Sequence, residues 1–432
     1  MAMDGSPATP LELPLHEPRP TGAPTALDGV LVADFSRVLA GPVCTQLLAD
    51  LGARVIKIEH PDGDDMRHAS QASIGGLTSA FLALNRGKQS LVLDLATAAG
   101  HEVAIDLVRR ADVLVENFTP GVMKRLKLDY DAIAKINPRL VYCSVSAYGQ
   151  TGAAARRSGY DPVIQAESGL MSLNGFADRP PVRIGPPVVD VSTGMMACNA
   201  VLAGLLARQH TGCGQHVEVA LFDTAANLGA LYGMSYLVDG NVPGRFGQAP
   251  PGAAPVGLFQ ASDGPFYLCI VNDRLFRRLA TDVLGRPELA GDPRFATNRA
   301  RTANRTALFA ALETAFAARP RDEWMSRLQA ANVPAGPMRT LAEAFASPEM
   351  AARGLARSLP HDTAGSVPNI GPPFRFSHTP TAAPAPAPAL GQHTKIVLSE
   401  VLGYDTARCT ALAGGGAFGK MQDETDGGDR HE

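Results

Sequence analysis

Short apolar runs alternate with segments of helical periodicity along the first third of the chain. The apolar runs are rich in Val, Leu and Ile, and they predict buried strands at 30–35, 53–59, 90–95, 111–117 and 140–148. The intervening apolar residues recur at helical spacing and predict helices at 43–52, 97–110, 120–127 and 129–136. Such alternation is typical of an α/β fold, a doubly wound and mostly parallel sheet with helices on both faces.

The pattern changes in the second half of the chain. After about residue 245, hairpin-like strands are followed by helices up to about residue 345, which predicts a smaller α+β domain. The Pro/Ala tract at 379–389 predicts an extended connector that returns the chain to its first domain. The expected division is a mobile leader at 1–26, a large domain at 27–225, a small α+β domain at 226–345, a returning segment at 346–410 and a disordered tail at 411–432.

Composition narrows the classes of partner. The 432 residues are 45% hydrophobic, which suffices for a sizeable core. A net charge of −3 provides no basic field for nucleic acid or for an anionic membrane. The six cysteines are scattered without metal-ligand spacing, and the N-terminus lacks the basic and apolar regions of a signal peptide. We therefore expect a cytoplasmic protein without a metal, a membrane span or a nucleic-acid partner.

The first strand–helix–strand unit imitates a dinucleotide-binding motif. Its loop, SRVLAGP, contains one glycine, Gly41, where the GxGxxG motif needs three. NAD and FAD are therefore disfavoured, and no GxxxxGK[ST] or HExxH motif points to ATP or to zinc. The crevice at the carboxyl ends of the strands is still the expected ligand site.

The stretch GPPVVDVSTGMMAC at 185–198 places a carboxylate, Asp190, among apolar residues. Ser192 or Thr193 can cap a helix predicted at about 193–209, so that Asp190 would lie just ahead of its positive end. The helix dipole would then favour the ionised form, and a poorly hydrated carboxylate can act as a nucleophile. From this stretch alone an ordinary capping or turn aspartate is the favoured interpretation, and local sequence does not decide between the two.

Several ordered blocks resemble the family III CoA transferases. The blocks include LDGVLVADFSRVLAGPVCTQLLADLGARVIKIEHPDGDDMR (27–67), ADVLVENFTPGVMKRLKLDY (111–130), GYDPVIQAESGLMSLNG (159–175) and VVDVSTGMM, and the match extends over most of 27–400. This family includes formyl-CoA:oxalate and carnitine CoA transferases and is related to the α-methylacyl-CoA racemases. The resemblance implies an enzyme that moves CoA from an acyl-CoA to a carboxylic acid, with no tightly bound cofactor. It also implies an interlocked homodimer of two-domain subunits.

The resemblance carries site residues onto this chain. The family's catalytic aspartate falls on Asp190, which would form covalent aspartyl intermediates. The positions that match CoA contacts are Arg37, Val38, Ala40, His60, Leu93, Leu95, Ala96, Asn117, Phe118 and Arg125. Of these, the segment around Leu93 would contact adenine largely through its backbone, and Arg125 would bind a phosphate. Arg86 and Lys88 are weaker candidates for further phosphate-binding cations.

Tyr160 separates the transferases from the racemases of this superfamily. Racemases place a histidine in this block, whereas this chain has Tyr160, whose ordinary pKa of about 10 suits a neutral-pH base poorly. A transferase is therefore favoured over a 2-methylacyl-CoA racemase. A CoA-binding protein without turnover stays open as a further alternative. Asp161, followed by Pro162, is expected to cap its own helix.

Three departures from the family pattern concern the substrate. Leu39 stands where formyl-CoA transferases carry a glutamine, and Ala96 replaces a lysine. The flexible tetraglycine gate of the oxalate enzymes has no counterpart, since 247–257 is Pro-rich. The missing gate favours a larger dicarboxylate or an acyl carboxylate over oxalate as the acceptor.

Overall fold

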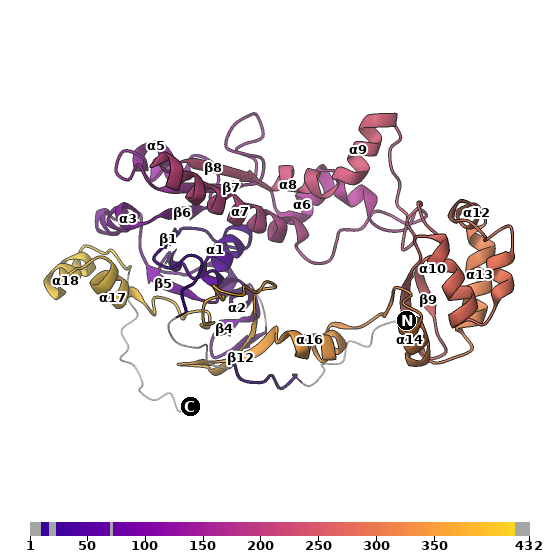
Figure 1. The fold of residues 1–432 in the computed structure, drawn as a ribbon. Helices are drawn as coiled ribbons and strands as arrows, with labels where there is room; N and C mark the ends of the chain where they lie inside the picture. Colours follow the sequence, from indigo (N-terminus) through magenta and orange to yellow (C-terminus); the bar gives the residue numbers. More distant parts are fainter. Residues whose placement is uncertain (1–9, 17–22, 70–71, 420–432) are drawn as a thin grey trace, which may run out of the picture. The chain divides into compact units, whose positions relative to one another are not determined.

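The computed structural model describes residues 10–16, 23–69 and 72–419. Their contacts divide the chain into two compact units (Figure 1). The first, which we call the sheet unit, consists of the described residues of Pro10–Ser168, Gly185–Leu228 and Pro348–Glu432. The second, the small unit, contains Gly169–Ile184 and Gly229–Ser347. Residues 169–184 thus group with the small unit, although the sequence pattern assigned them to the large domain.

The sheet unit contains a six-stranded parallel sheet in the order β5-β2-β1-β6-β7-β8. The strands are β1 Leu31–Asp34, β2 Arg54–Glu59, β5 Lys88–Val92, β6 Val113–Glu116, β7 Val141–Ser146 and β8 His216–Ala220. The parallel α/β prediction is confirmed, and β8 is a strand that the sequence pattern did not predict. In the register of the sheet, Asp34 lies opposite Lys57, and Lys57 lies opposite Ser90.

Helices cover both faces of this sheet (Figure 1). On one face, α1 Ala40–Asp50 contacts the strands, and α7 Val188–Thr211 packs along α1 and against β7 and β8. On the other face, α3 Ala98–Arg110 shares an apolar core with alternate strand residues such as Ala33 and Ile56. The C-terminal helices, α17 Thr394–Ile396, η4 Val397–Val401 and α18 Thr406–Gly414, join this second layer.

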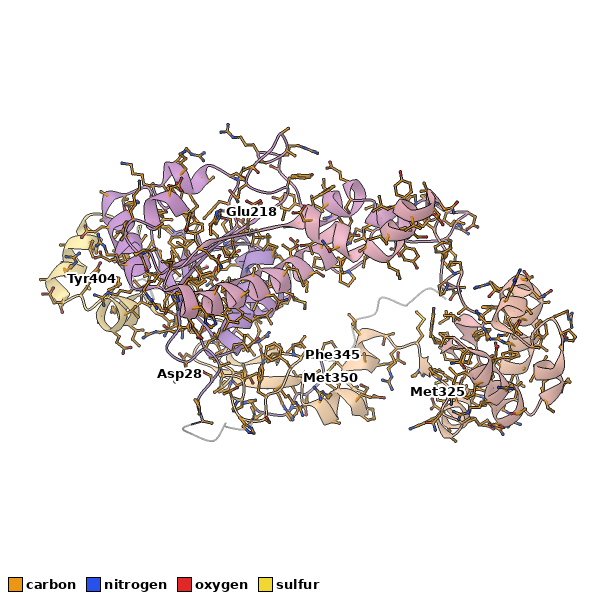
Figure 2. The ribbon with its side chains drawn as sticks, turned by 45° about the horizontal axis from the view of Figure 1, so that its top comes forward. Asp28, Glu218, Met325, Phe345, Met350 and Tyr404 are labelled. Carbon is orange, nitrogen blue, oxygen red and sulfur yellow. The ribbon has the colours of Figure 1, made fainter. Side chains whose placement is uncertain are left out.

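The C-terminal segment is tied to α3 and to the sheet edge. The Tyr404 hydroxyl donates to Asp106 at 2.6 Å (Figure 2), and Asp94 N–H donates to the Ala417 carbonyl at 2.8 Å. Phe418 is buried in the same core. The predicted start of a disordered tail at 411 is therefore too early, because the helix and its packing continue beyond it. Residues 420–432 of that predicted tail lie outside the described part of the chain.

Part of the predicted leader also has a defined partner. Leu15 forms an isolated parallel bridge with Ser358, which belongs to β12 Ala356–His361. This strand pairs with β13 Gly365–Ile370 in an antiparallel hairpin. Residues 1–9 and 17–22 of the predicted leader lie outside the described residues.

The Pro/Ala tract at 379–389 forms no regular element but packs closely on the sheet unit. Gly87 N–H donates to the Ala385 carbonyl at 2.9 Å, and Ala382 N–H donates to the Asp50 carbonyl at 2.8 Å. Ala387 is 1% exposed. The tract therefore works as a fixed strap rather than as a loose spacer.

The small unit is an α+β structure of its own. Its antiparallel sheet has the order β11-β10-β9, with strands β9 Val256–Gln260, β10 Pro265–Cys269 and β11 Ala335–Pro337. Helices α10 Asp273–Arg278, α13 Arg305–Phe316 and α14 Arg321–Ala330 enclose an aromatic core. The Arg245 guanidinium donates to the carbonyls of Phe176, Ala177 and Arg179, which ties 169–184 to this unit.

The remaining elements are short or lie at the edges of the two units. They are η1 Asp65–Arg67, β3 Ser73–Ile74, β4 Leu77–Thr78, α2 Ser79–Asn85, α4 Val122–Arg125, α5 Tyr130–Ile133, α6 Asp161–Glu167, η2 Leu170–Leu173, α8 Leu221–Leu228, α9 Ala230–Asp239, η3 Leu279–Val283, α11 Pro287–Gly291, α12 Asn298–Ala303, α15 Leu341–Phe345 and α16 Pro348–Arg353.

Helix α7 is longer than predicted and unusually apolar. It begins at Val188, ahead of the predicted start, so Ser192 and Thr193 lie inside the helix and cannot cap it. By length and composition alone, α7 is the one helix in the described residues that could cross a membrane, with 44% of its most apolar window buried. That criterion is weak, because the core helix of a folded domain also meets it, and α7 has such packing along α1, β7 and β8.

Candidate active site

A cavity of about 330 Å³ lies in the sheet unit, outside the carboxyl ends of β1, β6 and β7. The chain runs outward in opposite directions from β1 and its neighbour β6, so the cavity is at the point where strand order reverses. Open parallel sheets bind ligands at this point because the loops diverge there. Six residues expected in the site line the cavity: Arg37, Val38, Ala40, Asn117, Phe118 and Asp190.

The other expected CoA contacts follow neighbouring strands and do not line this cavity. His60 follows β2, and its half-exposed imidazole lies 3.2 Å from the Asp62 carboxylate. The side chain of Leu93, after β5, is 1% exposed and belongs to the core, against which Leu95 also packs. The Leu93 side chain is therefore closed to a ligand, whereas Leu95 is only partly buried. Carboxyl ends of parallel strands share one edge, which places all these residues on the same side of the sheet.

Two further expected positions lie away from the cavity wall. Ala96 follows the same segment, and its N–H donates to the Asp94 carboxylate at 3.0 Å. Arg125 ends α4 and is exposed, with a single 3.5 Å contact to the Gly121 carbonyl. Its guanidinium is therefore accessible to an anionic group from solvent.

Arg86 and Lys88 are not available to bind phosphate. Arg86 forms a buried pair with Asp50, in which Nε and one carboxylate oxygen are 2.9 Å apart. The Lys88 ammonium is fully buried and contacts the carboxylate of Asp34 at 3.1 Å and the side-chain carbonyl of Asn85 at 2.9 Å. Both cations neutralise carboxylates inside the protein, so the expectation that they bind CoA is wrong.

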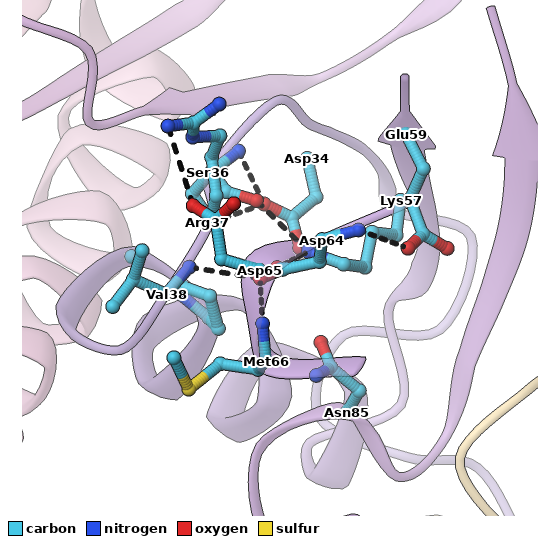
Figure 3. Close-up of polar contacts among 12 residues, drawn as sticks. Asp34, Ser36, Arg37, Val38, Lys57, Glu59, Asp64, Asp65, Met66 and Asn85 are labelled. Carbon is cyan, nitrogen blue, oxygen red and sulfur yellow. Dashed lines mark hydrogen bonds and ion pairs between the residues drawn. The ribbon is translucent and has the colours of Figure 1, made fainter. Parts of the chain in front are cut away.

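The loop after β1 forms one wall of the cavity and is held by side chains from three other segments. Two of these side chains, Lys57 and Asp64, are labelled in Figure 3. The Asn117 side chain accepts from Arg37 N–H at 2.8 Å and donates to the Arg37 carbonyl at 2.7 Å. Val38 has a φ of 67°, a left-handed conformation that is rare for a β-branched residue. Its N–H donates to Asp64, whose other oxygen pairs with Lys57 at 2.7 Å. The loop is therefore fixed in an unfavourable backbone conformation.

Asp190 lies in the first turn of α7, and the close packing of α7 on α1 brings it to this wall. A Cβ atom on Gly194 would lie only 2.6 Å from both the Ala40 carbonyl oxygen and the Val43 Cβ atom. Glycine is therefore required at this position, one helical turn after Asp190. The absence of a side chain allows the carboxylate to reach the loop after β1.

The electrostatic setting of Asp190 differs from the prediction. Asp161 does not cap its own helix; it accepts hydrogen bonds from the N–H groups of Val189 at 2.7 Å and of Asp190 at 3.1 Å. Asp161 therefore occupies the anion position at the N-terminus of α7 that was expected to stabilise the Asp190 carboxylate. Burial raises the pKa of Asp190 to about 7, and the neighbouring Asp161 adds to the rise.

A second buried carboxyl group lies directly beneath the cavity. Glu116 ends β6, is 4% exposed and accepts a hydrogen bond from Phe118 N–H at 2.9 Å. Burial raises its pKa to about 7, against the hydrogen bonds from Ser144 and Phe118 that favour its ionised form. Glu116 thus orients the Asn117–Phe118 segment, which lines the cavity.

The sequence interpretation missed one cavity cation, Arg157. It lines the cavity together with Tyr160, pairs with Glu167 and lies over the Tyr148 ring at 4.7 Å. Two successive arginines ahead of the GYD block were the available signal. Across the described chain, no group of three His, Cys, Asp or Glu side chains is arranged to hold a metal ion. The cavity therefore offers a carboxylate and two guanidinium groups, a set suited to acyl transfer on an anionic substrate.

Comparison with known proteins identifies the family. The model of CoA-transferase family III matches residues 27–394. The chain belongs to this family. It is thus an enzyme, a CoA transferase, whose substrates are CoA thioesters and carboxylic acids.

Relatives and solved structures extend the likeness over most of the chain. The acetyl-CoA:oxalate CoA-transferase of Acetobacter aceti is 43% identical over 79% of this chain and 88% of its own. The succinate–glutarate CoA-transferase of Agrobacterium fabrum is 38% identical, covering 87% of this chain and 95% of its own. A crystal structure of a CAIB/BAIF family protein from Brucella suis is 42% identical with a TM-score of 0.79, over 88% of this chain and all of that one.

Proposed function

We propose that this CoA transferase works through covalent intermediates on Asp190. The Asp190 carboxylate attacks the thioester carbonyl of the donor, giving a mixed anhydride and releasing CoA thiolate. The thiolate then attacks the aspartyl carbonyl, which forms an aspartyl-CoA thioester and releases the donor acid. The acceptor carboxylate attacks this thioester, giving a second mixed anhydride and thiolate. Attack of the thiolate on the acceptor's acyl carbonyl yields the new acyl-CoA and regenerates the carboxylate.

The observation that carries this proposal is the difference in hydrogen bonding between the Asp190 carboxylate and the neighbouring Asp161 carboxylate. Among the described residues, no donor hydrogen-bonds to the Asp190 carboxylate oxygens, which line the cavity next to Tyr160 and Ala40. A carboxylate with a raised pKa and no hydrogen-bond partner is more basic and less stabilised than a paired one, and is therefore the better nucleophile. One oxygen of the neighbouring Asp161 accepts from the N–H groups of Val189 and Asp190, and the other accepts from the Gln165 side chain at 2.6 Å.

The CoA moiety is proposed to lie along the carboxyl edge of the sheet. Its thioester end would meet Val38 and Ala40, which line the cavity with Asp190. Its phosphates would meet Arg125 and His60, whose side chains are exposed at this edge. The adenine would lie on the backbone of the segment after β5. No residue of this path has to move out of the core.

The acceptor is proposed to be a dicarboxylate larger than oxalate or an acyl carboxylate. Relatives act on both short and longer acids, as the names of the oxalate and of the succinate–glutarate enzymes state. Arg157 lines the cavity with its side chain about half exposed, and a guanidinium at that position can bind a second carboxylate. Its present partner Glu167 lies at the surface and can release it at little cost.

The proposal is tested by trapping the intermediates. The enzyme would be incubated with succinyl-CoA and hydroxylamine, which converts aspartyl anhydrides and thioesters to a hydroxamate. Peptide mapping should place the hydroxamate on Asp190, and mass spectrometry of wild-type reactions with a panel of acids should reveal the preferred acceptor. Labelling of another residue, with Asp190 unmodified, would refute the mechanism while leaving the family assignment intact.

We further propose that the enzyme is an interlocked homodimer. Helix α9 has no buried residue, and Leu231, Leu237 and Val238 are each 74–80% exposed. On α7, Met195, Met196 and Leu206 are also exposed. Apolar faces of this kind are typical of surfaces that a partner covers. Light scattering should give the mass of two chains, and interlocked subunits should not exchange with tagged ones unless they are unfolded.

A further inference from the structure

The loop that joins β1 to α1 contains the most strained residue near the cavity. Val38 takes a φ of 67° although its β-branched side chain disfavours the left-handed region, at a cost of about 1–2 kcal/mol. Strain of this size persists only where surrounding groups determine the backbone conformation. Val38 and the next two residues line the cavity together with Asp190, so the groups that determine this conformation also shape the cavity wall.

Besides the two Asn117 bonds to Arg37, the loop is restrained by one buried ion pair (Figure 3). Lys57 on β2 donates to the Ser36 carbonyl at 2.9 Å and to Asp64 at 2.7 Å. The other Asp64 oxygen accepts from Val38 N–H at 3.2 Å and from Met66 N–H at 3.0 Å. The pair therefore binds the loop on both sides of Arg37, through the Ser36 carbonyl and the Val38 N–H group.

The pair is itself held firmly in place. Asp64 N–H donates to Glu59 at 3.2 Å, and Glu59 is bound by both Nε and Nη2 of Arg67 at 2.8 and 2.7 Å. Each side chain of the Lys57–Asp64 pair is 1% exposed. Burial opposes both charges, but nearby opposite charges prevail: Asp34 and then Asp64 raise the pKa of Lys57, and Lys57 lowers the pKa of Asp64. Both groups are ionised at neutral pH.

An ion pair this deeply buried is not the most stable choice for the site. Removing two charges from water is costly, and an apolar pair of similar volume is often equally stable or more stable. The pair is therefore not explained by stability alone. Apolar side chains could not form the hydrogen bonds to the Ser36 carbonyl and to Val38 N–H.

We infer that Lys57 and Asp64 are positioning residues, which hold the strained Val38 loop so that the cavity wall stays aligned with Asp190. This inference rests on the proposed function, because it takes the Asp190 cavity as the reacting site. Neither residue lines the cavity. Their effect passes through the backbone of 36–40.

The test replaces the ion pair without leaving a lone buried charge. In the double variant K57M/D64L the fold should keep its melting temperature, because both charges are removed together. With the loop free to relax, kcat should fall by about 10–100-fold, as expected when a reacting group is displaced by about 1 Å. KM for the acyl-CoA should change less, because the exposed phosphate-binding side chains are untouched.

Two further variants separate positioning from general damage. K57M/D64N also lacks both charges but keeps an oxygen that can accept from Val38 N–H, so it should retain more of kcat than K57M/D64L. Adding V38G to K57M/D64L should restore part of kcat, because glycine takes a φ of 67° without strain. The matched control is D50L/R86M, which replaces another buried ion pair away from the cavity and should leave kcat unchanged.

The results have distinct meanings. Wild-type kcat in K57M/D64L, or equal losses in K57M/D64L and D50L/R86M, would overturn the positioning role. The hydroxylamine trap reports separately on the mechanism. In K57M/D64L it should still label Asp190, only more slowly. Labelling elsewhere in both the wild type and the variant would refute the proposed function, and a kcat loss confined to the loop variants would then still support the loop's role.

Discussion

Two carboxylates on opposite sides of one loop, Asp64 and Asp190, are in contrasting states. Asp64 is buried and bonded on both oxygens, and Lys57 helps to hold its pKa below the ordinary value. Asp190 is less deeply buried but has no donor, and its pKa rises to about 7. Burial favours the neutral form of both groups, so the difference comes from their partners. The paired carboxylate fixes the loop, and the unpaired one is free to react.

The strongest test of this contrast is to remove Asp190, the carboxylate that is proposed to react. D190A should reduce CoA exchange by about a thousandfold or more, because no other described side chain in the cavity is a carboxylate. CoA binding, measured by calorimetry, should change little, since the proposed CoA contacts lie elsewhere. Substantial residual turnover would mean that Asp190 is not the nucleophile.

Stability should respond in opposite directions at the two carboxylates. D64N leaves the buried Lys57 ammonium without its partner and should cost about 3–5 kcal/mol. D190N should instead stabilise the protein by about 1–3 kcal/mol at pH 8, because a raised folded-state pKa means that stability is lost as pH rises through about 7. The gain should vanish near pH 4, where both proteins carry a neutral group. Urea unfolding at the two pH values measures it, and destabilisation by D190N at pH 8 would contradict the assignment.

The close packing between α1 and α7 provides a test with an expected effect of intermediate size. G194A places a methyl group 2.6 Å from the Ala40 carbonyl oxygen, so α7 must shift and the fold should lose about 1–3 kcal/mol. Because Asp190 lies one turn away, kcat should fall as well. G204A is a control on the same helix, where the nearest atom is Val141 Cγ1 at 2.8 Å, away from the cavity. An equal loss of kcat in both would show that Gly194 has no special role.

The smallest expected effect concerns pH. Ionisation of Asp190 should make kcat/KM rise with pH through about 7. D161N removes the neighbouring negative charge while keeping an oxygen for the N–H groups of Val189 and Asp190. The pKa of Asp190 should then fall, which moves the acid limb of the profile to lower pH by up to about one unit. A shift to higher pH would show that Asp161 supports the ionised form.

The local sequence pattern predicted most strands of the sheet but missed the edge strand β8. Strands β1, β2, β6 and β7 were predicted from apolar runs, because both faces of a parallel sheet are covered. Strand β5 was predicted at 90–95 but spans Lys88–Val92, and its first three residues are polar. Strand β8, His216–Ala220, alternates polar and apolar residues at the edge of the sheet and carries no such signal. The start of α7 was also missed, since its N–H groups are capped by Asp161 from a distant segment rather than by Ser192 or Thr193.

The candidate site, like the fold, could be predicted only in part from the sequence. Asp190 and the loop residues Arg37, Val38 and Ala40 could be named from motifs, and the structure gathers them around one cavity. Arg86 and Lys88 could not be excluded from sequence, because a cation's partner is invisible until the fold brings Asp50 and Asp34 beside it. The roles of Lys57 and Asp64 were hidden for the same reason.

The sequence by itself determined the parallel α/β sheet, the family and the residue that is proposed to react. Each of these depends on short-range periodicity or on ordered motifs, which a linear chain displays directly. Only the tertiary structure decided which charges are paired, which carboxylate keeps a raised pKa, and how a strained loop is held against it. Those properties depend on burial and on contacts between residues far apart in the chain, and both exist only once the chain has folded.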